Sequence, residues 1–181
     1  IVLYHGRLGW KKGFDTLIPA FAEVVKKEPE AVLVIAEWSD EGYKQTIREF
    51  VAKYKLEQSI VFTEKLEGKE RAEAFKDSAV FVCTSYSENF GVAVVQPMAA
   101  GVPVVVTEGV AISPSIKEAS AGHVVPKNEA EIVEAIVNIL KSPMQGKKMG
   151  EAGKELVQRE FNGETVAEKW IKEYNELVPH L

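Results

Sequence analysis

Short, uninterrupted runs of apolar residues alternate along the chain with longer segments in which apolar residues recur every three or four positions. The first pattern is typical of strands buried on both sides, and the second is typical of amphipathic helices. The apolar runs predict strands at residues 1–5, 31–36, 59–62, 79–83, 102–106 and 122–125. The periodic segments predict helices at residues 14–27, 40–55, 69–76, 90–100, 113–119, 129–140, 147–160 and 165–177.

This alternation of strands and helices predicts the fold class. Parallel strands need long crossover connections, so the order favours one parallel sheet of about six strands with helices on both faces. The expected architecture is therefore α/β, doubly wound and Rossmann-like. No repeat or linker interrupts residues 1–181, which we interpret as one domain. The last two helices keep apolar positions such as Trp170 and Tyr174, which either pack back on the body or meet a neighbour outside this chain.

Composition narrows the class of protein. The chain is 46% hydrophobic and 27% charged with a net charge of −5, which is ordinary for a soluble globular protein and does not favour a nucleic-acid partner. No apolar run reaches membrane-spanning length, and no signal-peptide pattern is present. The single cysteine, Cys83, falls inside a predicted strand, which favours the core of a cytoplasmic protein. Because the sequence begins with Ile1 and not with an initiator Met, we expect a fragment of a longer protein.

The loop after the first predicted strand is rich in glycine and cations. In doubly wound sheets, ligands bind outside the carboxyl ends of the strands, so such loops are the candidate sites. Residues 6–13 hold Arg7, Lys11 and Lys12 without the Gly-x-Gly-x-x-Gly pattern of a dinucleotide site. Arginine clamps phosphate in bidentate fashion, and lysine adds a point charge. The loop is thus either a phosphate site or a solvated basic turn.

The loop after the fourth predicted strand carries Glu88, and Asn89, Phe90 and Gly91 open the helix that follows. A helix N-terminus presents free N–H groups and a positive dipole end, which attract anions. Glu88 either accepts hydrogen bonds from hydroxyl groups or only caps the helix. Because both loops lie at one edge of the sheet, together they predict a site for a diphosphate joined to a polyhydroxyl group, such as a nucleotide sugar.

These motifs resemble those of the carboxyl-terminal half of the family 4 retaining glycosyltransferases, which have the GT-B fold. The resemblance rests on Gly6-Arg-Leu, Lys12-Gly13, Ser87-Glu-Asn-Phe-Gly91 and Met98-Ala-x-Gly101-x-Pro-Val-Val105, and it extends through nearly the whole chain. It implies a donor-binding domain of a two-domain enzyme that transfers a hexose-type sugar to a hydroxyl acceptor. The acceptor (a glycan, lipid or small molecule) would meet an amino-terminal domain that this chain lacks, and the whole protein could associate peripherally with a membrane.

The resemblance also implies roles for individual residues. Arg7 and Lys12 would bind the donor diphosphate and stabilise the leaving nucleotide, while Glu88 would hold hydroxyls of the donor sugar. Further donor contacts would come from a group of backbone and side-chain positions, namely Gly6, Asn89, Phe90, Gly91, Val92 and Gln96. No metal and no other cofactor is expected, because the two cations and the helix N-terminus neutralise the diphosphate.

The sequence departs from the family pattern at several positions. A second glutamate of the family is Gln96 here, and Pro97 follows it, so we expect weaker ribose contacts and a kink near Ala93. Glu37 and Glu64 place acids in turns at the expected nucleotide edge, where negative charge is unfavourable. These departures favour a second hypothesis, a degenerate GT-B-like domain that acts as a non-catalytic binding or scaffold module.

Overall fold

The computed structural model describes residues 1–38 and 41–178. Within these residues one parallel sheet has the strand order β3-β2-β1-β4-β5-β6. Its strands are β1 (Val2–Arg7), β2 (Leu33–Trp38), β3 (Ile60–Thr63), β4 (Val80–Cys83), β5 (Val104–Thr107) and β6 (Gly122–Val125). The order changes direction between β1 and β4, which is where ligands bind in doubly wound sheets. The predicted six-stranded parallel sheet is confirmed.

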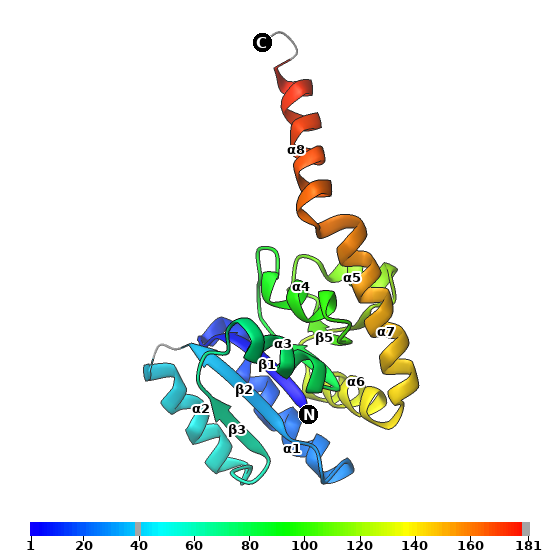
Figure 1. The fold of residues 1–181 in the computed structure, drawn as a ribbon. Helices are drawn as coiled ribbons and strands as arrows, with labels where there is room; N and C mark the ends of the chain where they lie inside the picture. The colour runs from blue at the N-terminus through cyan, green and yellow to red at the C-terminus, as the bar shows by residue number, and fades with distance from the viewer. Residues whose placement is uncertain (39–40, 179–181) are drawn as a thin grey trace.

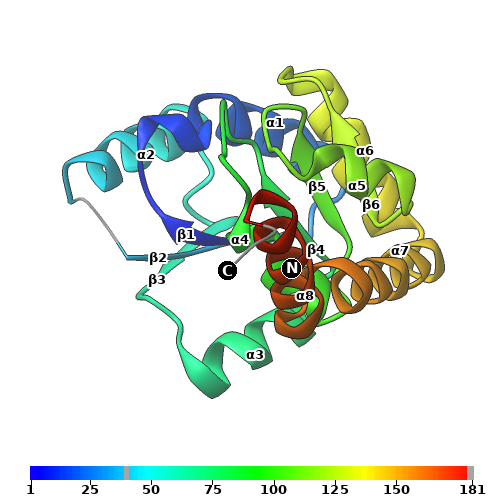
Figure 2. The ribbon, with the colours of Figure 1, turned by 90° about the horizontal axis from the view of Figure 1, so that it is seen from above.

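Helices cover both faces of this sheet (Figures 1 and 2). One core contains the buried sides of α1 (Phe14–Lys27), α2 (Glu41–Lys53) and α6 (Glu129–Lys141). The other contains residues of α3 (Gly68–Asp77), α4 (Val92–Ala99), α5 (Ser113–Glu118) and α7 (Pro143–Leu156). Along β1, Val2 and Tyr4 belong to the first core and Leu3 to the second. The strands are apolar throughout because both of their faces are buried.

Most predicted elements are confirmed, and the differences lie at their ends. The first strand continues past His5 to Arg7, and the fifth begins at Val104 rather than at residue 102. The central helix begins at Val92, two residues later than expected. The seventh helix begins at Pro143, because proline suits a first helical turn, and a π-helical turn, η2 (Val157–Phe161), follows it. The predicted start of the second helix, at residue 40, lies outside the described residues.

Helix α8 (Gly163–Leu177) projects away from the body (Figure 1). Of the two alternatives left open for the last two helices, packing on the body holds for α7, which buries Leu156, and not for α8, none of whose residues is buried. Whether α8 meets a neighbour stays untested. Its exposed apolar side chains include Val166, Trp170, Ile171, Tyr174 and Leu177. Over the described residues no helix has the length and apolar character needed to cross a membrane.

Candidate functional site

A cleft of about 740 Å³ opens at the switch point between β1 and β4. The loops after these two strands form its walls. The cleft is lined by seven residues that the sequence pointed to, namely Arg7, Lys12, Glu88, Asn89, Phe90, Gly91 and Val92. Two other predicted donor contacts, Gly6 and Gln96, are not among its lining residues. The fold therefore brings together the cationic loop and the acidic loop, which are far apart in the sequence.

The loop after β1 is held against the end of β4 by backbone contacts. A short 3-10 turn, Trp10–Lys12, ends at Gly13, which has a left-handed φ of 73°. A Cβ atom at Gly13 would lie only 2.1 Å from the Thr84 carbonyl oxygen, so glycine is required here. The Thr84 hydroxyl donates to the Lys12 carbonyl at 3.1 Å, and the Tyr86 N–H donates to the Lys11 carbonyl at 2.8 Å. The two walls of the cleft are therefore joined directly.

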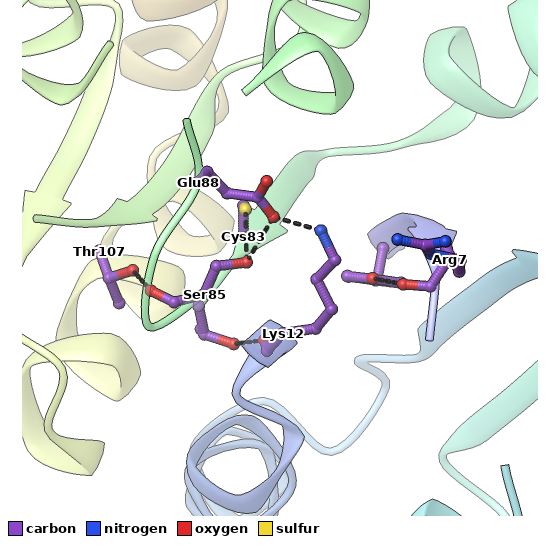
Figure 3. Close-up of polar contacts among 8 residues, drawn as sticks. Arg7, Lys12, Cys83, Ser85, Glu88 and Thr107 are labelled. Atoms are coloured by element: carbon purple, nitrogen blue, oxygen red, sulfur yellow. Dashed lines mark hydrogen bonds and ion pairs between the residues drawn. The ribbon is translucent and has the colours of Figure 1, made fainter. Parts of the chain in front are cut away.

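Glu88 is held by its backbone and by its side chain. Its N–H donates to the Gly109 carbonyl at 3.0 Å, and its carbonyl accepts from the Ala111 N–H at 3.1 Å, so the loop after β5 supports it. Its Oε1 atom forms an ion pair with the Lys12 ammonium and accepts a hydrogen bond of 3.0 Å from the Ser85 hydroxyl (Figure 3). Among the described residues no group donates a hydrogen bond to Oε2. One carboxylate oxygen thus faces protein donors, and the other is available for a ligand.

The charges of the cleft favour an anionic ligand. Arg7 is exposed at the end of β1, and within the described part of the chain no acidic side chain pairs with its guanidinium. Lys12 and Glu88 neutralise each other, so Arg7 and Lys11, which also lines the cleft, leave a net positive charge there. Helix α4 begins at the cleft wall, where Gly91, with φ 102°, starts a helix whose first N–H groups have no partner within it. A cation and a helix N-terminus together suit a phosphate group.

The departures from the family pattern fall mostly away from the cleft. Gln96 is half-buried, and α4 continues through the buried Pro97; the predicted kink and ribose contact stay untested. Glu64 lies just beyond the edge strand β3, is exposed and does not line the cleft. The side chain of Glu37 lies outside the described part of the structure.

Two groups near the cleft are part of the core. Cys83 is buried, as predicted, and burial raises the pKa of its thiol. His5, in β1, is also buried, with its Nε2 atom 3.2 Å from the Leu66 carbonyl oxygen and its ring 5.8 Å from that of Phe75. Burial lowers the pKa of His5. Neither side chain lines the cleft, so both belong to the scaffold that supports it.

Sequence reasoning missed the contacts that hold the Glu88 loop in place. Ser85 is one of them, since its hydroxyl donates to the Glu88 carboxylate. The Ser-x-x-Glu spacing was an available signal, because in a capping box the side chain of each of the two residues bonds to the backbone of the other. Tyr86 is another: its hydroxyl donates to Asp15 Oδ2 at 2.6 Å, and the Lys127 ammonium lies 3.6 Å from its ring centre. Lys127 also lies 3.6 Å from Asp15, which links the loops after β4 and β6 to α1.

The structure offers no evident metal centre in the part of the chain that it describes. Across residues 1–38 and 41–178, no three His, Cys, Asp or Glu side chains gather as a metal ion would require. The prediction that the reaction needs no metal remains untested.

Comparisons with known proteins agree with this geometry. The family described as "Glycosyl transferases group 1" matches residues 1–156. The mannosylfructose-phosphate synthase of Agrobacterium fabrum is 32% identical over 113 residues, which cover 59% of this chain and 25% of that protein. The chain spans less than half the length of the curated relatives that it matches.

Solved structures show the same fold. A sucrose-phosphate synthase from Thermosynechococcus elongatus superposes with a TM-score of 0.87 and 28% identity, covering 98% of this chain and 45% of that one. HepE from Anabaena in complex with UDP superposes with a TM-score of 0.85 and 17% identity, covering 97% of this chain and 48% of that one. The GT-B domain fold is therefore shared, and the matched structures also extend well beyond it.

Proposed function

The chain belongs to the group 1 glycosyl transferases, and from this premise we propose that it is the nucleotide-sugar-binding domain of a retaining enzyme. The enzyme transfers a hexose-type sugar from a nucleotide diphosphate to a hydroxyl group of an acceptor. The observation that carries the proposal is the meeting of Arg7, Lys12 and Glu88 in one cleft at the switch point of the sheet. Two cations and one carboxylate match a diphosphate attached to a sugar.

Each of these side chains has a role in the proposed reaction. When the bond between the anomeric carbon and the diphosphate breaks, negative charge grows on the leaving oxygen. Arg7 and Lys12, with the N-terminus of α4, stabilise that charge without the help of a metal ion. The Oε2 atom of Glu88 accepts a hydrogen bond from a hydroxyl of the donor sugar. Asn89, Phe90, Gly91 and Val92 line the wall beside it.

The remainder of the enzyme supplies the acceptor side. We propose that this chain is the carboxyl-terminal domain and that an amino-terminal domain completes the cleft, because the relatives are more than twice as long as the matched segment. The exposed apolar side of α8, with Trp170 and Tyr174, suits contact with that domain. A glycan, lipid or small molecule is the acceptor, and the enzyme acts in the cytoplasm, in peripheral contact with a membrane if the acceptor is a lipid.

Titration of the 181-residue chain with UDP- and GDP-sugars tests the proposal. Calorimetry should detect saturable binding of at least one nucleotide sugar at millimolar or lower concentration. An Arg7→Gln, Lys12→Met double variant removes both proposed diphosphate contacts and serves as the negative control. If the folded wild-type chain binds no nucleotide sugar at millimolar concentration, the proposal is wrong.

The second candidate function is a degenerate domain that serves as a binding or scaffold module. The observation in its favour is Gln96, which replaces the family's second glutamate and lies outside the cleft lining. A Gln96→Glu variant distinguishes the two functions. In an active domain, the acid should leave donor affinity similar or increase it, since charge-assisted hydrogen bonds are about twice as strong as neutral ones. In a degenerate domain, neither the wild type nor this variant should bind a donor.

A further inference from the structure

We propose that Ser85 is the positioning residue for Glu88, because its hydroxyl holds one carboxylate oxygen and thereby directs the other toward the donor sugar. The inference rests on the proposed function, in which Glu88 contacts that sugar. It adds a residue that touches neither the sugar nor the diphosphate and acts only through the orientation of Glu88.

Ser85 is rigidly placed. Only 1% of its surface is exposed, and its hydroxyl lies 3.0 Å from Glu88 Oε1 and 3.4 Å from the Cys83 sulfur. Its carbonyl accepts a hydrogen bond of 2.6 Å from the Thr107 hydroxyl (Figure 3). Strand β4 and strand β5 thus anchor the serine from two sides. A buried donor in a fixed position restricts the Glu88 carboxylate to one orientation.

Lys12 cannot fill this role alone. Its ammonium also pairs with Oε1 of Glu88, but Lys12 lines the cleft, where the donor diphosphate would compete for it. Ser85 is absent from the lining of that cleft, so no donor group competes for its hydroxyl. When the ammonium turns toward a phosphate oxygen, the Ser85 hydrogen bond remains and keeps Oε2 directed at the sugar. A hydrogen bond to a charged acceptor is strong enough for this purpose.

The test compares affinity for a nucleotide with affinity for its sugar conjugate. Calorimetry on the 181-residue chain with UDP, UDP-glucose, GDP and GDP-mannose gives the preference of each variant for the conjugate. Ser85→Ala should lower that preference about tenfold, as loss of a hydrogen bond to a charged group does, and leave nucleotide affinity within about twofold. In a protein that already carries Glu88→Gln, Ser85→Ala should change the preference for the sugar conjugate little further. Ser113→Ala removes another buried hydroxyl, whose partner is the Glu108 carbonyl at 3.4 Å, and should leave the preference unchanged.

Each outcome of this test supports or overturns the role of Ser85. A wild-type preference that Ser85→Ala retains overturns the inference and leaves the proposed function intact. Equal losses for the nucleotide and its conjugate indicate a merely structural role and also overturn it. A folded wild-type chain that binds neither ligand overturns the proposed function and this inference together. If Ser85→Ala does not fold, Ser85→Cys keeps a similar size with a weak donor, and the same selective loss supports the inference while its absence overturns it.

Discussion

Lys12 and Glu88, separated by 76 positions in the sequence, form an ion pair across the two walls of the cleft. Their side chains are 24% and 22% exposed, so the pair is partly accessible to solvent. Pairs near the surface contribute roughly 0–1 kcal/mol to folding, because water screens them and side-chain entropy opposes them. The arrangement therefore matters for the position of the two groups in the cleft more than for stability.

Lys12→Met and Glu88→Gln should separate the two halves of the donor. Loss of the Lys12 ammonium should lower the affinity for UDP or GDP and for their sugar conjugates alike, by roughly tenfold, because all of them carry the diphosphate. Glu88→Gln should weaken only the sugar conjugates. Calorimetry with each nucleotide and its sugar measures the difference. Lys27→Met, on the exposed end of α1, is the matched control. Equal weakening of both ligands by Glu88→Gln would contradict the assignment.

Arg7 should bind the diphosphate without stabilising the fold. Its side chain is exposed, and no acidic partner holds it among the residues described. Arg7→Gln should weaken nucleotide binding by roughly tenfold, and Arg7→Lys should recover only part of the affinity, because a point charge lacks the bidentate geometry. The urea midpoint of both variants should match that of the wild type. Full affinity in Arg7→Gln would exclude Arg7 from the site.

Local pattern was sufficient to predict the fold. The apolar runs of β1, β4 and β5 predicted buried parallel strands, because a sheet covered on both faces leaves no strand position for polar alternation. The position of the site at the carboxyl ends of the strands then followed from the general position of ligands in such sheets, whereas the switch point between β1 and β4 is known only from the strand order in the structure. The convergence of Arg7, Lys12 and Glu88 on one edge was predicted for that reason.

The sequence pattern could not predict the contacts between loops. The Lys127 ammonium contacts the Tyr86 ring, and neither the periodicity of apolar residues nor the spacing of the motifs indicates such a contact. The direction of α8 was also undetermined, because an amphipathic pattern shows that a face needs a partner and does not say which partner covers it. We expected Glu64 to place negative charge beside the nucleotide, but it does not line the cleft, because the strand order places β3 at the sheet edge, far in the order from β4.

Gly150→Ala should destabilise the protein although alanine is the better helix former. In α7 a Cβ atom at Gly150 would lie 1.9 Å from the Gly101 carbonyl oxygen, so α7 would have to move away from the loop before β5. Overpacking of this kind typically destabilises by about 1–3 kcal/mol. A Cβ atom at Gly163, at the start of α8, would meet no atom within 4 Å. Gly163→Ala should therefore be neutral or stabilise the protein by up to about 1 kcal/mol. Urea unfolding of the two variants measures both effects, and equal midpoints would contradict the contact.

Stability should fall as the pH drops below about 6.5, the ordinary pKa of histidine. Burial lowers the pKa of both His5 and His123 in the folded protein. The hydrogen bond to the Leu66 carbonyl opposes this shift in the pKa of His5, and the charges of Arg71 and Lys65 add to it, whereas Glu134 raises the pKa of His123. Between the folded and unfolded pKa values the unfolded chain binds more protons, so the free energy of unfolding rises with pH in that window and decreases as pH falls.

Urea unfolding between pH 7.5 and 5.5, where most carboxylates stay ionised, measures this loss of stability. A His5→Gln, His123→Gln double variant removes the two titrating groups and should show a flatter profile. If the double variant loses as much stability as the wild type over the same window, the two histidines are not the source of the pH dependence.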